Sequence, residues 1–283
     1  ELMQRAGASA FERGRRLWPQ ASHWLIATGA GNNAGDGLVV AKHALQAGFN
    51  VTLVALKAYS EFSGDPQKAW QDLLSIKKEP HQTFDILGVE EAKAQELSFA
   101  DVIVDALLGT GVAGVLKDDY CQLIDQLNGI KAAKLALDIP TGIYADNGCC
   151  VKKSEQAIAF KADATVSFVA FKVGQRLGHA LEYQGQLYLE TLGVRNSLAY
   201  GEVPQAWWSD IEHLKDKLPA RSMVSSKFDC GHALIVGGGE NLVRTQLGRA
   251  VEIDRRGGLV GAESDDFPHS HTNCGIYHIL TAN

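Results

Sequence analysis

A glycine-rich segment between an apolar run and a helical pattern constrains the fold of this chain more than any other stretch. It reads Gly29-Ala-Gly-Asn-Asn-Ala-Gly-Asp-Gly37, and it follows the apolar run 24–28, which predicts a buried strand. Residues 38–45 come next and have apolar positions at helical spacing. Glycines at a strand-to-helix turn let backbone amides approach a ligand, and a helix start favours anions. The polar side chains within this turn predict a site for a polar ligand head or a cation beside a phosphate.

Strand-like and helix-like segments alternate over the first two hundred residues. We expect strands at 24–28, 51–56, 101–105, 134–138, 165–168 and 186–190, and helices at 2–17, 36–47, 65–75, 89–97 and 118–128. Strands that are continuous apolar runs separated by helices indicate a mostly parallel sheet covered on both faces. The predicted fold is an α/β, three-layer, Rossmann-like sandwich with a mostly parallel central sheet.

The organisation of the chain changes near residue 200. We expect one domain over 1–215 that ends in a connector helix, a linker over 216–230, and a fragment over 231–283 that begins with a strand and a glycine turn. About 50 residues are too few to bury a core of their own. The chain starts at Glu1 inside a helical pattern, from which we expect that an upstream segment is missing.

Charge and cysteine content limit the classes of partner. The net charge of −6 argues against a nucleic acid or an anionic membrane surface as the main partner. No apolar stretch approaches the roughly 20 residues needed to span a bilayer. The five cysteines lack paired metal-ligand spacing, which favours free thiols in a reducing cytosol. We therefore expect a cytoplasmic protein that acts on a small molecule. A homodimer is compatible with these features, and the oligomeric state stays open.

Polar signatures follow the ends of separate predicted strands. They are the segment 32–36, Asp105 with the glycine-rich turn 109–114, and Asp138 with the segment Ile-Pro-Thr-Gly142. Because the carboxyl ends of parallel strands meet at one edge of a sheet, these segments are expected to form a single pocket. As the alternative, the aspartates cap turns and the glycines permit tight loops.

The side chains at this edge are rich in oxygen. Asn33, Asp105 and Thr141 would suit a hard cation such as Na⁺, K⁺ or Mg²⁺, and the backbone amides of 109–115 could hold a diphosphate. Asp138 is the best candidate for a general acid or base, since it ends a buried strand. Lys172 is a second candidate, with an exposed, solvated lysine as the alternative.

These segments together resemble a known family. Residues 31–43, Val104-Asp-Ala-Leu-Leu-Gly-Thr-Gly111 and Leu137-Asp-Ile-Pro-Thr-Gly142 resemble the YjeF N-terminal domain, the family of the NAD(P)H-hydrate epimerases. The likeness covers about residues 1–195 in order. It implies a Rossmann-type sandwich with isomerase activity, which interconverts the R and S forms of hydrated NADH and NADPH (NADHX and NADPHX) in the repair of damaged nucleotides.

The resemblance also implies roles for individual residues. Asn33, Asp105 and Thr141 would bind a potassium ion as cofactor. Asp138, together with Lys172, is our hypothesis for the proton-transferring group. Ala34 stands where the family usually has glycine, and it would be strained if that position needs a positive φ. The residues expected to contact the substrate are Asn32, Asn33, Ala34, Gly35, Asp36, Gly109, Thr110, Gly111, Val112, Ala113, Gly114, Val115 and Asp138.

The end of the chain resembles part of a second domain. Residues 231–241 resemble the start of a ribokinase-like domain, the ADP- or ATP-dependent dehydratase that follows the epimerase in bifunctional relatives, and we expect that activity to be lost through truncation.

An NAD-dependent oxidoreductase would need an acidic residue after the second strand, and 51–60 contains none. A non-catalytic dinucleotide-binding or scaffold module of the same fold is the other alternative.

Overall fold

The structure is a computed structural model that describes residues 1–112, 114–153 and 156–194, and the short strands at 232–236, 251–253, 259–261 and 278–282. The chain divides into two compact units, Glu1–Trp207 and Trp208–Asn283. Each unit is described by itself.

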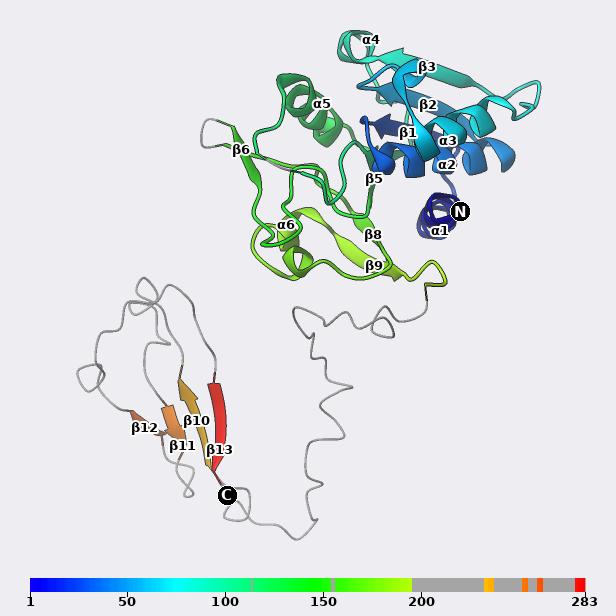
Figure 1. The fold of residues 1–283 in the computed structure, drawn as a ribbon. Helices are drawn as coiled ribbons and strands as arrows, with labels where there is room; N and C mark the ends of the chain where they lie inside the picture. The colour runs from blue at the N-terminus through cyan, green and yellow to red at the C-terminus, as the bar shows by residue number, and fades with distance from the viewer. Residues whose placement is uncertain are drawn as a thin grey trace. The chain divides into compact units, whose positions relative to one another are not determined.

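A seven-stranded sheet forms the centre of the first unit (Figure 1). Its strands are β1 (His23–Thr28), β2 (Asn50–Ala55), β3 (Phe84–Gly88), β4 (Val102–Ala106), β5 (Ala133–Leu137), β8 (Ala164–Phe168) and β9 (Gln186–Glu190). Their order is β3-β2-β1-β4-β5-β8-β9, and every neighbouring pair is parallel. The prediction of a mostly parallel sheet is confirmed. The sequence did not predict β3, an edge strand whose residues are all exposed or half-buried, so that it lacks the continuous apolar run of a central strand.

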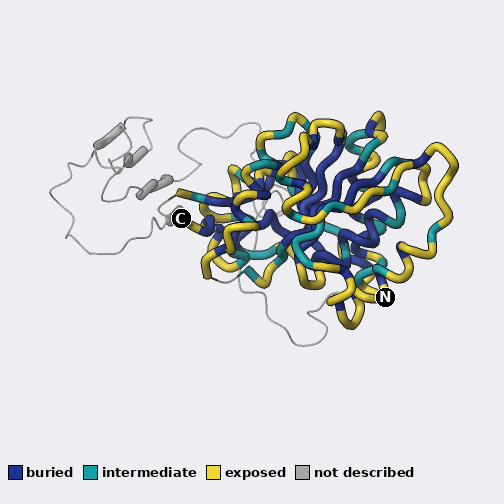
Figure 2. Tube along the Cα trace, turned by 90° about the horizontal axis from the view of Figure 1, so that it is seen from above, coloured by how far each residue is buried: buried dark blue, intermediate teal, exposed yellow. Residues whose placement is uncertain are grey.

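Helices cover both faces of this sheet. The helices α1 (Leu2–Leu17), α2 (Asn32–Gln46) and α3 (Gly64–Leu74) contribute to one core, while α4 (Val89–Ala94) and α5 (Asp118–Gly129) contribute to the other. Strand β1 shows the alternation that separates the two cores, because Trp24 and Ile26 belong to the first and Leu25 and Ala27 to the second. Figure 2 shows buried segments in the interior of this unit and mostly exposed segments at its periphery. The three-layer prediction is therefore confirmed.

Helix α2 packs closely against the sheet and is held at the site by that packing. A Cβ added at Gly37 would lie 2.4 Å from the Cβ of Ala106, so only glycine permits this approach of helix to strand. The apolar residues Leu38, Val39 and Val40 are fully buried behind it. At about 1.5–3 kcal/mol for each buried aliphatic side chain, they fix the start of α2 at the end of β1.

Several short elements were not predicted. They are the 3₁₀ helices η1 (Tyr59–Glu61) and η2 (Val173–Arg176), the short helix α6 (Ala180–Tyr183), and the antiparallel pair β6 (Val151–Lys153) and β7 (Gln156–Ile158). They carry no long periodic pattern, which is the signal that sequence analysis relies on. Two of them, η2 and α6, nevertheless lie in the segment that connects β8 to β9 and contribute to the site described below.

In the second unit the structure describes four short antiparallel strands. They are β10 (His232–Val236), β11 (Val251–Ile253), β12 (Leu259–Gly261) and β13 (His278–Ala282), in the order β12-β11-β10-β13. The strand expected within 231–239 is present as β10, whereas β11, β12 and β13 were not predicted. The expected connector helix at the end of 1–215 and the linker at 216–230 lie outside the described residues. Among the helices that the structure describes, none is both long and apolar enough to cross a bilayer.

Candidate active site

The glycine-rich segment is helical earlier than its sequence suggested. We expected a turn up to Asp36 and a helix over 36–47, but α2 begins at Asn32, so that residues 32–36 form its first turn. The N-cap is Gly31, which has no side chain to accept hydrogen bonds from this turn. Ala34 is helical and buried, and the expected strain at a positive φ does not arise there. The start of α2 can therefore hold an anion through its first amides.

Three strand ends meet beside this helix start. The strand order reverses direction between β1 and β4, which makes the gap between them the point where ligands bind in open α/β sheets. A Cβ placed on Gly109, after β4, would lie 3.6 Å from the Cβ of Asn33, after β1. The same Cβ would lie 3.7 Å from Oδ2 of Asp138, after β5. The predicted convergence of these segments on one edge is present.

The side chain of Asn33 lacks hydrogen-bond partners. It is only 8% exposed, and neither its Oδ1 nor its Nδ2 has a partner among the described residues. Nine-tenths or more of buried polar groups in proteins are satisfied, so an exception needs an explanation. A ligand that contacts this amide would provide one.

Asp105 is fully buried and joined to Thr141. Its carboxylate accepts hydrogen bonds from the backbone N–H of Thr141 (2.7 Å), the hydroxyl of Thr141 (2.7 Å) and the N–H of Leu107 (3.1 Å). Burial raises the pKa of Asp105 to about 6, and these hydrogen bonds oppose that rise. Asp105 thus fixes the turns after β4 and β5, as the capping alternative expected. No hydrogen bond joins Asn33 to either residue within the described part of the chain.

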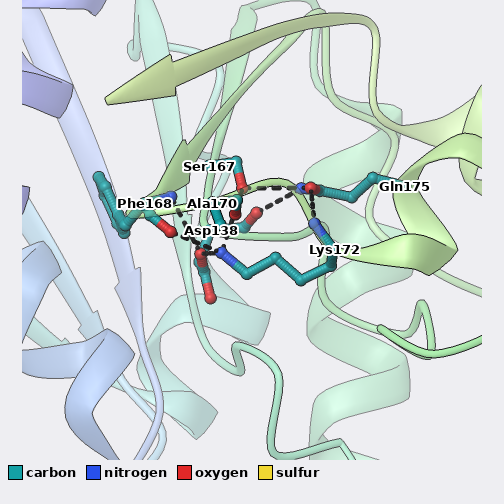
Figure 3. A network of polar contacts seen from close by, with 6 residues as sticks. All are labelled: Asp138, Ser167, Phe168, Ala170, Lys172 and Gln175. Atoms are coloured by element: carbon teal, nitrogen blue, oxygen red, sulfur yellow. Dashed lines mark hydrogen bonds and ion pairs between the residues drawn. The ribbon is translucent and has the colours of Figure 1, made fainter. Parts of the chain in front are cut away.

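Asp138 and Lys172 form an ion pair at the same edge (Figure 3). Asp138 has a left-handed backbone, with φ of 65°, and its Oδ1 accepts from the N–H of Phe168 at 3.2 Å. The Lys172 ammonium pairs with that same Oδ1 and donates to Ser167 Oγ (3.1 Å) and to the Phe168 carbonyl (3.0 Å). The two charged side chains are 17% and 18% exposed. The alternative of a solvated, exposed lysine is therefore wrong.

Sequence analysis missed two residues of this network. Ser167 and Gln175 are fully buried, and the Gln175 amide contacts the backbone of both Lys172 and Asp138 (Figure 3). The available signal for Ser167 was a polar residue within a buried strand. Gln175 lies on η2, which has no pattern of its own, so its role depends on the tertiary structure.

Asp36 faces this ion pair from α2. Burial, and secondly the negative charge of Asp138, raise the pKa of Asp36 to about 8. Its carboxyl group makes no hydrogen bond or ion pair with the residues that the structure describes. At neutral pH the edge therefore presents a protonated Asp36 beside the charged pair of Asp138 and Lys172, which is a combination of one acid and one base.

The segment expected to hold the diphosphate is largely exposed. Its last residue, Val115, is 73% exposed, and Ala113 lies outside the described residues. The hydroxyl of Tyr144, from the turn after β5, donates to the Gly114 carbonyl at 3.0 Å. This contact ties the segment to the Asp138 turn.

A groove of about 770 Å³ lies at the opposite edge of the sheet, along the residue stretches 17–21, 98–101 and 131–133. Its Asp101 carboxylate accepts from the N–H groups of Ser22 and His23 and from the Ser22 hydroxyl. Its Asp163 accepts the N–H of Lys134. These carboxylates stabilise strand starts, and we place the candidate site at the carboxyl edge.

An all-parallel sheet with its glycine-rich helix start at the strand-order reversal defines the class of Rossmann-like α/β proteins. The family model described as "YjeF-related protein N-terminus" matches residues 1–174, and the chain belongs to this family. The crystal structure of the yeast protein YNL200c supports the fold, with a TM-score of 0.56 and 21% identity over 74% of this chain and 86% of that one.

Curated relatives match most of the chain. The bifunctional NAD(P)H-hydrate repair enzyme of Escherichia coli is 37% identical over 84% of this chain and 43% of the relative. The NAD(P)H-hydrate epimerase of Rhodopirellula baltica is 36% identical over 68% of this chain and 75% of the relative. The chain thus spans less than half the length of the bifunctional relative and most of the length of the epimerase.

Proposed function

We propose that this chain is an isomerase that interconverts the R and S forms of hydrated NADH and NADPH. The observation that carries the proposal is the half-buried ion pair of Asp138 and Lys172, with the uncapped start of α2 at the same carboxyl edge of the sheet. Membership of the family supports the same activity, since one relative that this chain covers to three quarters is named an NAD(P)H-hydrate epimerase.

Proton transfer is the chemistry that the side chains offer. Inversion at a hydroxyl-bearing ring carbon breaks and remakes a bond at that carbon, and protons move to and from oxygen as it does so. Asp138, paired with Lys172, is the base in this proposal. Asp36 is the acid, because burial and the nearby charge of Asp138 raise its pKa to about 8.

The dinucleotide is bound by backbone groups in this proposal. Its diphosphate would lie against the first turn of α2, residues 32–36, and against the segment 109–115, where amides rather than lysines carry the attraction. Thr110, Gly111, Gly114 and Val115 are exposed and so accessible to a substrate.

Potassium is the proposed cofactor. The amide of Asn33 is buried without partners, and a carboxamide oxygen is a ligand that hard cations accept. Asp105 and Thr141 supply further oxygens at the same edge, and a bound cation would favour the charged form of Asp105. The donor set fits such an ion, which would fix the turns around the substrate electrostatically.

We also propose a cellular setting for the chain. With a net charge of −6, the chain fits a cytoplasmic enzyme that works on a small molecule without nucleic acid or a membrane as partner. A homodimer is an expectation that the molar mass in solution tests directly.

The activity is tested by supplying R-hydrated NADPH together with a separate dehydratase that consumes only the S form. We expect this chain to accelerate the loss of the R form, and Asp138→Asn to remove the acceleration. If the wild-type chain leaves the rate at its spontaneous value while still binding the dinucleotide, it is a binding or scaffold module.

A further inference from the structure

The ion pair of Asp138 and Lys172 joins segments that are far apart in the chain. Asp138 follows β5, and Lys172 follows β8, 34 residues later. Asp138 has a φ of 65°, and Val169, in the turn before Lys172, has the same φ. Irregular backbone of this kind persists only where its surroundings hold it.

One side chain contacts the backbone of both partners. The Gln175 Nε2 donates to the backbone carbonyl of Asp138 at 2.7 Å. Its Oε1 accepts from the backbone N–H of Lys172 at 2.8 Å and lies 3.1 Å from Ser167 Oγ. The planar amide therefore spans the two segments (Figure 3). It also contacts Ser167, whose Oγ accepts from the Lys172 ammonium.

Gln175 is itself immobilised. Its side chain is fully buried, and its backbone carbonyl accepts from Nε2 of Gln184 at 2.8 Å. The carbonyl of Gln184 in turn accepts from the hydroxyl of Thr165, in β8, at 2.7 Å. A chain of buried hydrogen bonds thus runs from the central sheet to the ion pair, and it fixes the backbone that carries the Gln175 side chain.

We infer that Gln175 is the positioning residue of the reaction, which holds the Asp138 carboxylate and the Lys172 ammonium in register while touching no substrate. Catalytic groups need their geometry within about 0.5 Å, and that precision comes from surrounding side chains with locked rotamers. With both ends of the amide engaged, Gln175 meets this requirement. The inference rests on the proposed epimerase function.

The test measures kcat, KM and Tm for Gln175→Met, which keeps the length of the side chain and removes its hydrogen bonds. We expect kcat to fall about tenfold to a hundredfold, because the pair is misplaced. KM should stay within about twofold, because the residue lies outside the binding surface. Gln175→Asn, which keeps the amide but is too short to span both segments, should act in the same direction and serves if the first variant does not fold.

Gln82→Met is the matched control. Gln82 is also a buried glutamine with backbone partners, donating to the carbonyls of Leu45 and Phe49 at 2.7 Å each and accepting from the N–H of Glu79 at 3.0 Å. Its loss should lower Tm and leave kcat unchanged at temperatures where the variant is folded.

Each outcome decides one question. A wild-type kcat in the folded Gln175 variants overturns the positioning role. So does a fall in kcat that Gln82→Met matches at an equal fall in Tm. In both cases the epimerase function stands. A wild-type chain without epimerase activity instead overturns the proposed function.

Discussion

Asp138 lies close enough to Asp36 for its negative charge to add to burial in raising the pKa of Asp36 to about 8. In the unfolded chain Asp36 would titrate near 3.8. The folded state therefore retains a proton that the unfolded state releases between these pH values. This difference links the stability of the fold to the protonation of the site.

The first prediction concerns Asp36→Asn and the pH dependence of stability. The contribution of Asp36 is fully present below about pH 4 and is lost as pH rises through about 8, because its folded pKa is raised. The loss is on the order of 5 kcal/mol at most, at about 1.4 kcal/mol for each pKa unit. The asparagine variant should lack this decline. Urea unfolding of both proteins between about pH 4 and pH 8 measures the free energy of unfolding. If that free energy changes with pH in the same way in both proteins, the raised pKa of Asp36 is contradicted.

Asp138→Asn should reduce kcat about 10²- to 10⁴-fold, the contribution typical of a general base. The amide keeps the shape of the side chain but cannot take a proton, so binding of the dinucleotide should persist. Epimerisation rates and equilibrium binding, measured on the same preparation, separate the two effects. An unchanged rate would show that another group transfers the proton.

Asn33→Leu tests the proposed potassium site. The substitution removes a buried amide without partners, so the protein should be as stable as the wild type or more so without potassium. Wild-type Tm should rise when tetramethylammonium is replaced by K⁺ at equal ionic strength, and the variant should lose that response. If the wild-type Tm and activity are the same in both salts, the proposal of a potassium cofactor fails.

Tyr144→Phe should weaken substrate binding with little effect on kcat. The lost hydrogen bond to the Gly114 carbonyl contributes about 1 kcal/mol, which corresponds to about a fivefold rise in KM, because the 109–115 segment loses its tie to the Asp138 turn. Initial rates over a range of substrate concentrations give both constants. A fall in kcat at constant KM would place Tyr144 nearer the chemistry than the structure does.

The sequence predicted the helix boundaries less well than the strand ends. It placed the start of α2 at residue 36 because glycine and asparagine favour turns, whereas the structure begins this helix at Asn32. Packing explains the difference, since burial of residues 33–35 against neighbouring elements overrides their local preference. The strain anticipated at Ala34 is absent, and Asp138, a candidate site residue, has the left-handed backbone instead.

The sequence by itself determined the parallel sheet and the edge at which its polar residues gather. Continuous apolar runs indicate strands that are buried on both faces, as in a parallel sheet. Parallel strands necessarily bring their carboxyl ends together. Tertiary structure decided which of those residues meet. Contacts between segments distant in the chain pair Lys172 with Asp138 and join Gln175 to the Asp138 backbone. They also bury the side chain of Asn33 without hydrogen-bond partners among the described residues. Local patterns carry no record of such contacts, because they are set by how the layers pack.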